Sequence, residues 1–249
     1  MLAWIGCKSQ KSRLASAESD KLDLSKVNEE DPREHLMKIG FGCRMFWAFR
    51  GRDEYVNLSR STFSEGVFNE KHPFAGQPFV ALKFIGNEKT HKLSVHASYL
   101  RDTTNIMRAP INHDDPRDFG ASLLRLFQKM ASNQDRIYCQ PVLKPHRQRV
   151  GGWYYPNKPL GENTVSILFK DGAKILGLKN PEEFGMHSLR AYCITTMANS
   201  EDVSLEECMN VARHSSVAAN VIYQERSSTS EGNRMKATGG ICQKRATKA

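Results

Sequence analysis

Apolar residues recur at helical spacing along much of the chain. The clearest pattern opens at Asp31-Pro32, because proline suits the first turn of a helix, and it runs to Arg50 with Leu36 and Ile39 on its apolar face. Further helical patterns occur over residues 115–127, 163–176, 187–199, 204–211 and 217–223. Helices therefore make up most of the predicted regular structure.

Alternation of apolar and polar residues predicts one small antiparallel sheet. Residues 78–84 have the composition of a strand, Gly86-Asn87 offers a turn, and residues 92–97 alternate like a returning strand. Residues 139–162 are rich in proline, glycine and aromatic residues and are typical of a loop. The predicted fold class is α+β, mainly α-helical with a small antiparallel β-sheet.

Composition divides the chain into three parts. We place residues 1–30 in a polar lead-in, residues 31–237 in one domain, and residues 238–249 in a basic flexible tail. No apolar run approaches the roughly 20 residues that span a bilayer, so we expect no membrane association. Six cysteines without a Cys-x-x-Cys pair indicate reduced thiols in an intracellular protein and no zinc site.

The chain is basic, with 36 Lys and Arg residues against 27 Asp and Glu residues and a net charge of +9. This excess favours an anionic partner, most often nucleic acid, although many basic proteins bind nothing acidic. Two segments are candidates for DNA contact, and their residues are Lys144, Arg147, Arg149, Asn163, Lys170 and Lys174. The second segment also has core-like positions, such as Val165 and Leu168, so an ordinary packing helix is its alternative.

Residues suited to chemistry follow one another in a definite order. His187 and Arg190, in Phe-Gly-Met-His-Ser-Leu-Arg, are three positions apart and share one face of a helix. His214 and Tyr223 are nine positions apart, a spacing that permits a histidine at the start of a helix and a tyrosine near its end. Upstream, a charge cluster at Arg50 closes the first helix, and the hairpin turn of the predicted sheet follows it.

Each of these residues also has an ordinary structural alternative. The arginines suit solvated helix surfaces, the histidines suit helix caps, and Tyr223 follows two β-branched apolar residues as a core aromatic would. Lysine is common in a polar turn, so Lys89 in the hairpin turn has Lys83 and Lys92 as rivals. Only the ordered set, taken together, favours chemistry over these alternatives.

The order Arg, Lys, His-x-x-Arg, His, Tyr resembles the tyrosine recombinases, also called phage-type integrases. Two segments are most similar to the eukaryotic Crypton-like branch: Trp-Tyr-Tyr-Pro-Asn-Lys-Pro-Leu-Gly-Glu-Asn-Thr-Val from Trp153, and Arg-His-Ser-Ser-Val-Ala-Ala-Asn-Val-Ile-Tyr up to Tyr223. The resemblance covers about residues 31–237. It implies the catalytic domain of a mobile-element protein for DNA recombination or integration, which in a eukaryote acts in the nucleus.

The resemblance also assigns the residues that would hold the scissile phosphate. Arg50 and Arg190 would bind its non-bridging oxygens, since guanidinium groups donate paired hydrogen bonds and stay charged. His214 would add a further hydrogen bond. Asp53 matches the acidic residue that supports the first arginine in this family, with Glu54 as the alternative.

Proton transfer and attack fall to the remaining three residues of the set. His187 would assist proton transfer, and Lys89 would protonate the departing 5′ oxygen. Tyr223 would attack the phosphorus and form a covalent 3′-phosphotyrosine, which keeps the bond energy so that rejoining needs no ATP, metal or other cofactor.

The chain departs from the family in two places. Arg213 stands where the family usually has glycine, and the stretch ahead of Arg50 is too short for the helical core-binding domain of full-length recombinases, so we expect modest DNA affinity. The expected partner is double-stranded DNA, bound by a tetramer if residues 224–238 pack on a neighbouring copy. Alternatives are a DNA-binding module that no longer recombines, a type IB topoisomerase, and an unrelated helical scaffold.

Overall fold

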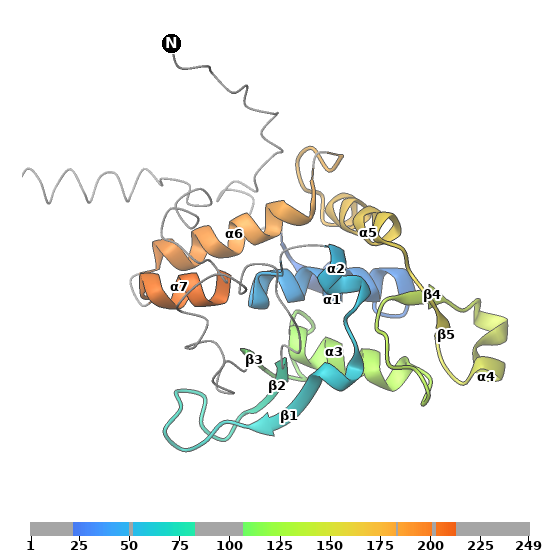
Figure 1. Ribbon diagram of the computed structural model, residues 1–249, viewed down its shortest axis with the longest axis horizontal. Coiled ribbons are helices and arrows are strands. Elements are labelled where there is room, and N and C mark those ends of the chain that lie inside the picture. Colours follow the sequence, from blue (N-terminus) through green and yellow to red (C-terminus); the bar gives the residue numbers. More distant parts are fainter. Residues whose placement is uncertain (1–21, 50–51, 83–106, 183, 201–202, 213–249) are drawn as a thin grey trace, which may run out of the picture. The chain divides into compact units, whose positions relative to one another are not determined.

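The computed structural model describes residues 22–49, 52–82, 107–182, 184–200 and 203–212 (Figure 1). The chain divides into two compact units, Met1–Cys193 and Ile194–Ala249, which we describe separately. The described residues are mainly helical with small antiparallel sheets, as the sequence predicts. None of the described helices combines the length and the apolar character needed to cross a membrane.

Helix α1 (Pro32–Trp47) is the central element of the first unit (Figure 1). It begins where the sequence predicts, because the Asp31 carboxylate accepts hydrogen bonds from the backbone N–H groups of Arg33 and Glu34. Most of its side chains are buried, since it packs against both α3 (Phe119–Lys129) and α5 (Glu162–Ile175). These two crossings form most of the core of this unit.

The helix crossings need small residues at the points of contact. A β-carbon on Gly42 would lie 2.0 Å from the Phe119 ring, where α1 crosses α3. A β-carbon on Gly172 of α5 would lie 2.4 Å from the sulfur of Met37. Because real side chains cannot approach that closely, glycine at both positions fixes how near the helices lie to one another.

A three-stranded antiparallel sheet forms in the order β1 (Phe63–Val67), β2 (Pro78–Leu82) and β3 (Met107–Pro110). Strand β2 confirms the strand predicted at residues 78–84, as far as it is described. The returning strand predicted at residues 92–97 lies outside the described residues. Strands β1 and β3, which pair on either side of β2, were not predicted.

The segment 139–162 is not the loop that its composition predicts. It holds an antiparallel pair, β4 (Cys139–Pro141) and β5 (Tyr154–Pro159), with η5 (Lys144–His146) and α4 (Arg147–Val150) between the strands. Tyr154 explains the order, because it is fully buried and its hydroxyl donates a 3.1 Å hydrogen bond to the Pro32 carbonyl.

The remaining elements are short or follow the predictions closely. The short ones are η2 (Leu24–Lys26), α2 (Arg52–Val56) and η3 (Arg60–Thr62). Helices α6 (Met186–Asn199) and α7 (Leu205–Ala212) confirm the helices predicted at 187–199 and 204–211. Within the second unit, Ile194, Cys208 and Ala212 form a small core of their own. The helix predicted at 217–223 lies outside the described residues.

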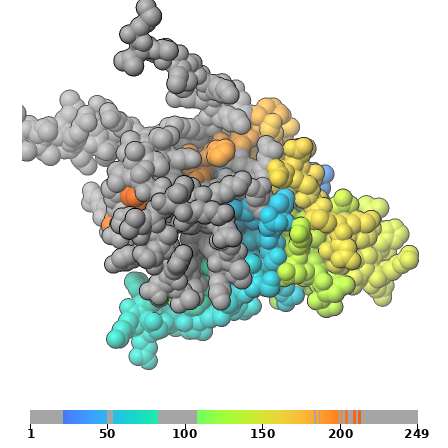
Figure 2. Space-filling view, in the orientation of Figure 1, coloured from blue at the N-terminus to red at the C-terminus, as the bar shows by residue number. Residues whose placement is uncertain are grey.

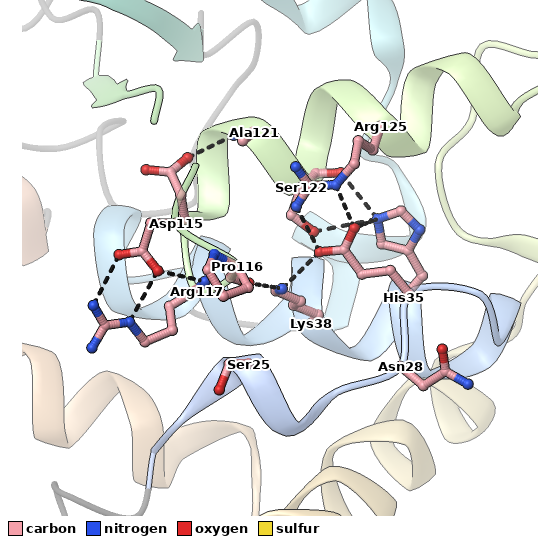
Figure 3. A network of polar contacts seen from close by, with 12 residues as sticks. Ser25, Asn28, His35, Lys38, Asp115, Pro116, Arg117, Ala121, Ser122 and Arg125 are labelled. Carbon is pink, nitrogen blue, oxygen red and sulfur yellow. Dashed lines mark hydrogen bonds and ion pairs between the residues drawn. The ribbon is translucent and has the colours of Figure 1, made fainter. Parts of the chain in front are cut away.

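Residues 24–29, which we placed in the polar lead-in, belong to the packed structure. Leu24 and Val27 are 4% exposed and join the core. Glu29 accepts hydrogen bonds from Arg125 at 2.6 and 2.9 Å and from Lys38 at 2.6 Å. Figure 3 shows that the side chains of Lys38, Arg125 and the buried His35 point toward one another between α1 and α3. This ion cluster ties the segment ahead of α1 to both α1 and α3.

Candidate active site

Arg190 joins α6 to the end of α1. It is 1% exposed, and its Nη1 donates a hydrogen bond to the carbonyl oxygen of Ala48. One turn further along α6, the thiol of Cys193 lies 3.0 Å from the carbonyl oxygen of Met45. Two contacts thus fix the His-Ser-Leu-Arg helix on the last turn of α1, and Ala48 stands two positions before Arg50.

The end of α1 has a backbone conformation that is unusual for its residue. We predicted that the helix runs to Arg50, but it ends at Trp47 because Ala48 is left-handed, with φ 45° and ψ 42°. That conformation is unfavourable for a residue with a β-carbon, and such residues are concentrated at functional sites. The turn separates α1 from α2, and Arg50 falls between these helices in the sequence.

A buried arginine that the sequence analysis missed lies one turn before Ala48. Arg44 is fully buried, and its Nε donates a 2.9 Å hydrogen bond to the hydroxyl of Tyr55 on α2, which in turn donates to the Gly40 carbonyl at 3.2 Å. The Arg44 guanidinium also lies over the rings of Tyr55 and Phe169, at 5.4 and 5.7 Å. Arg44 therefore braces α1 against α2 on either side of Arg50.

The electrostatics of this brace keep the tyrosine neutral. Burial raises the pKa of the Tyr55 hydroxyl well above its usual range, and the nearby Arg44 guanidinium opposes this only partly. A neutral hydroxyl can donate to one partner and accept from another, as Tyr55 does. The sequence did offer a sign of this buried arginine, because Arg44 is a charged residue within the apolar pattern of the first helix.

His187 and Arg190 occupy the same helix but differ in exposure. Since α6 begins at Met186, His187 lies in its first turn, where it is exposed to solvent. The Ser188 hydroxyl accepts a 3.3 Å hydrogen bond from the Gly185 N–H at this helix start. The arrangement leaves His187 accessible to a ligand, with the Arg190 guanidinium beneath the surface.

Four of the six predicted catalytic residues, Arg50, Lys89, His214 and Tyr223, lie outside the described residues. Of the two candidates for the supporting acid, Asp53 and Glu54, both belong to the α2 backbone and the Glu54 side chain is half-buried. The convergence of the six predicted catalytic residues on one phosphate remains a prediction. Within the described residues, no group of three or more His, Cys, Asp or Glu side chains is placed to hold a metal ion.

Helix α5 presents the candidate DNA-binding residues on its outer face. Asn163 and Lys174 are exposed and Lys170 is half-exposed, while Val165 and Leu168 are buried. The predicted packing face and the predicted polar face are therefore both present on one helix. Lys174 forms a 2.7 Å ion pair with Glu182 that raises the lysine pKa.

The other candidate segment also lies at the surface. Lys144 and Arg149 are exposed, and Arg147 is half-exposed because its guanidinium lies over the ring of Trp153. None of these three forms an ion pair with a carboxylate of the described residues. Contact of either segment with DNA remains a prediction.

Comparison with known proteins supports the fold. No protein-family model matches the sequence, and no curated protein matches it. Among solved structures, the crystal structure of XerA recombinase is similar, with a TM-score of 0.51 and 14% sequence identity. The match covers 91% of this chain and 65% of that recombinase chain. At this identity the likeness establishes the fold, which is that of a tyrosine-recombinase-like catalytic domain.

Proposed function

We propose that this chain breaks and rejoins double-stranded DNA as a site-specific recombinase or integrase, through a covalent 3′-phosphotyrosine on Tyr223. The observation that carries the proposal is the bond between Arg190 and Ala48. It brings the His-Ser-Leu-Arg motif, which lies 142 positions away in sequence, to the segment that leads into Arg50. The similarity of the fold to a recombinase supports the same conclusion.

The proposed chemistry distributes its charges among side chains of the chain itself. Arg50 and Arg190 neutralise the non-bridging phosphate oxygens, and His214 donates a further hydrogen bond. The exposed His187 assists proton transfer. These groups stabilise the charge that develops at phosphorus without a metal ion.

Attack and departure complete the proposed reaction. The Tyr223 hydroxyl gives up its proton to His187 as its oxygen forms a bond to phosphorus, the bond to the 5′ oxygen breaks, and Lys89 supplies the proton that the departing 5′ oxygen takes up. Rejoining is the reverse reaction, with a 5′ hydroxyl as the attacking group. Because each step exchanges one phosphoester for another, no ATP is consumed.

We also propose where DNA binds, how copies of the protein assemble, and from which branch of the family it derives. DNA binds along α5 and the basic segment after residue 143, and the protein acts as a tetramer in which residues 224–238 pack on a neighbouring copy. On the resemblance of its motifs, the proposed origin is a mobile element of the Crypton-like branch, and the proposed site of action is the nucleus. The type IB topoisomerases share the chemistry and are the nearest alternative class.

A DNA-binding module without recombinase chemistry is the second candidate function. Arg190 favours it, because a guanidinium that is 1% exposed and bonded to a backbone carbonyl also suits a purely structural role. The two candidates share DNA binding and differ only in whether Tyr223 reacts.

The decisive experiment traps the covalent intermediate. A duplex selected by binding from a randomised pool is converted to a nicked suicide substrate and incubated with wild type, Tyr223→Phe and Tyr155→Phe. Tyr155 is the matched control, since it is a half-buried tyrosine of β5 that does not belong to the proposed catalytic set. We expect a denaturation-resistant protein–DNA adduct with wild type and Tyr155→Phe and none with Tyr223→Phe.

Other results would assign the remaining candidates. Salt-dependent DNA binding without any adduct would support the binding module. An adduct that persists in Tyr223→Phe would remove Tyr223 from its role. Absence of both binding and adduct would leave the unrelated helical scaffold.

A further inference from the structure

Residues 142–153, which we call the basic loop, form a surface rich in positive charge. A 2.8 Å hydrogen bond from the Val142 N–H to the Trp153 carbonyl closes it. It contains Lys144, His146, Arg147 and Arg149 and no acidic residue, and the nearest acids in the sequence are Asp135 and Glu162. Figure 2 shows this part of the chain, in yellow-green, at the edge of the described surface.

Trp153 is held in place by the backbone at the base of the loop. The backbone N–H of Trp153 donates a 2.8 Å hydrogen bond to the Lys129 carbonyl at the end of α3. The preceding Gly152 lies so close that a β-carbon there would be 2.5 Å from the backbone nitrogen of Ala131. Because the Trp153 side chain also packs against the hydrophobic core, the indole has a fixed position relative to α3.

Two cations lie over this indole ring, and only one of them has an anionic partner. The Arg147 guanidinium carbon is 3.9 Å and the Lys129 ammonium 4.2 Å from the ring centroid. Lys129 is neutralised by a 2.9 Å ion pair with Glu30. No carboxylate of the described residues pairs with Arg147, and its buried Nε has no hydrogen-bond partner there.

An arginine in this environment is prepared to bind an anion that offers two neighbouring oxygens. Contact with the indole restricts the side chain before any ligand arrives, so less conformational entropy is lost on binding. A guanidinium that lies over a ring keeps N–H donors in its own plane, and these match the oxygens of a phosphate group. Lys144 and Arg149 stand on the same loop, exposed, to contact neighbouring phosphates.

We infer that the basic loop binds the phosphate backbone of duplex DNA, with Arg147 positioned in advance by Trp153. The loop supplies salt-dependent affinity without sequence preference, whereas α5 supplies the contacts to base edges. The inference rests on the DNA binding in the proposed function but not on strand cleavage. An acidic protein is the less favoured partner, because Leu143 is the loop's single strongly exposed apolar residue and protein interfaces need a larger apolar centre.

The test measures how affinity for random-sequence duplex DNA depends on salt. Full-length wild type is compared with Arg147→Gln, with the triple variant Lys144→Gln/Arg147→Gln/Arg149→Gln, and with Arg117→Gln as the matched control. Arg117 is equally a surface arginine, but it is paired with Asp115 at 3.0 Å beside other acids. We expect the slope of log affinity against log salt to fall by about 1 for Arg147→Gln, by about 3 for the triple variant, and negligibly for the control.

The outcomes separate this surface from the proposed reaction. The slope is measured on intact random-sequence duplex, so it reports binding whether or not the protein cleaves DNA. If wild type forms no adduct but the slopes change as expected, the recombinase function fails and the surface stands. Unchanged slopes in the triple variant, equal changes in Arg117→Gln, or tighter binding of polyglutamate than of DNA would each overturn the inference.

Discussion

Buried polar side chains fix the arrangement of the helices near the candidate site more strongly than the charges at the surface do. Arg44 and Arg190 are buried, and each donates a hydrogen bond to a well-placed oxygen: Arg44 to the Tyr55 hydroxyl, and Arg190 to the Ala48 carbonyl at the end of α1. A buried guanidinium is costly unless its donors are satisfied, so these oxygens hold the region in one arrangement. The end of α1 and the helix α2, which flank Arg50 in the sequence, depend on these oxygens.

Removing the Tyr55 hydroxyl tests this dependence. Tyr55→Phe leaves the Arg44 Nε and the Gly40 carbonyl without their common partner, at a cost of about 1–3 kcal/mol in the free energy of unfolding. Urea denaturation monitored by circular dichroism measures the loss. Tyr155→Phe is the control, because the Tyr155 hydroxyl has no hydrogen-bond partner among the described residues, and it should change stability by less than about 0.5 kcal/mol. Equal effects of the two substitutions would contradict the brace.

His35 makes stability depend on pH. Burial, together with the cations Lys129 and Lys38, lowers its pKa from 6.5 to about 4, although the Ser122 carbonyl and Glu29 oppose this. The unfolded chain therefore binds a proton that the folded protein excludes between pH 6.5 and 4. Stability is fully present above pH 6.5 and is lost as the pH falls toward 4.

The measurement is urea denaturation at pH 7.5 and pH 5. We expect wild type to lose about 2 kcal/mol from this group over that interval, and His35→Gln to lose correspondingly less. His113→Gln, at an exposed position, should keep the wild-type difference. Burial would raise the pKa of Glu29, but hydrogen bonds from Arg125 and Lys38 hold it far below normal. Glu29 therefore takes up its proton only below the interval from pH 7.5 to pH 5. A His35→Gln variant with the full wild-type loss would exclude His35 as the cause.

Among the elements, helix starts were the most predictable feature and strands the least. The start of α1 follows from the local cap at Asp31, whereas α3 begins later than predicted because the Asp118 carboxylate, not that of Asp115, accepts from a helix N–H, that of Ala121. Strand β1 has the sequence Phe-Ser-Glu-Gly-Val, which gives little alternation. Its strand structure comes from pairing with β2, which is a tertiary interaction that local sequence does not encode.

Helix α5 carries the prediction about DNA sequence. Asn163, Ile167 and Lys170 recur at helical spacing on its exposed side, and Ile167 is 49% exposed although it is apolar. Asparagine reads adenine through two hydrogen bonds, and an exposed isoleucine can contact a thymine methyl group in the same groove. The helix thus presents both kinds of contact that distinguish A·T pairs.

Selection of bound duplexes from a randomised pool measures this role. Asn163→Ala should lose the preference at one base pair, worth about 1–3 kcal/mol, while preferences elsewhere in the site persist. Lys144→Gln should instead weaken binding to all sequences alike. An unchanged sequence preference in Asn163→Ala would show that α5 does not read that base.

Across the first unit, charge is distributed along the direction of α3. At the start of this helix, a groove of about 500 Å³ is lined by three acids, Asp23, Asp114 and Asp115, and by one cation, Arg117. At its other end, Lys129 and the basic loop gather around Trp153. A net charge alone, such as +9, does not reveal this polarity, because it depends on which residues the fold brings to each end.

The candidate site shows the same limit of sequence reasoning at the scale of the molecule. The motif order led to Arg190 because its spacing to His187 is local. The partner of Arg190 is a backbone carbonyl 142 positions away, and any residue can supply a carbonyl, so no sequence pattern marks Ala48. Arg44 was missed because its role depends on Tyr55, which approaches only after α2 turns back on α1.

The ion cluster around Glu29 has a practical consequence for anyone who shortens this protein. A version that starts at residue 31, where the helical pattern starts, would remove the only carboxylate that the described residues place on both Lys38 and Arg125. It would also strip Leu24 and Val27 from the core. Trimming ahead of Asp23 keeps these anchors, so that boundary should give the more soluble and better-behaved sample.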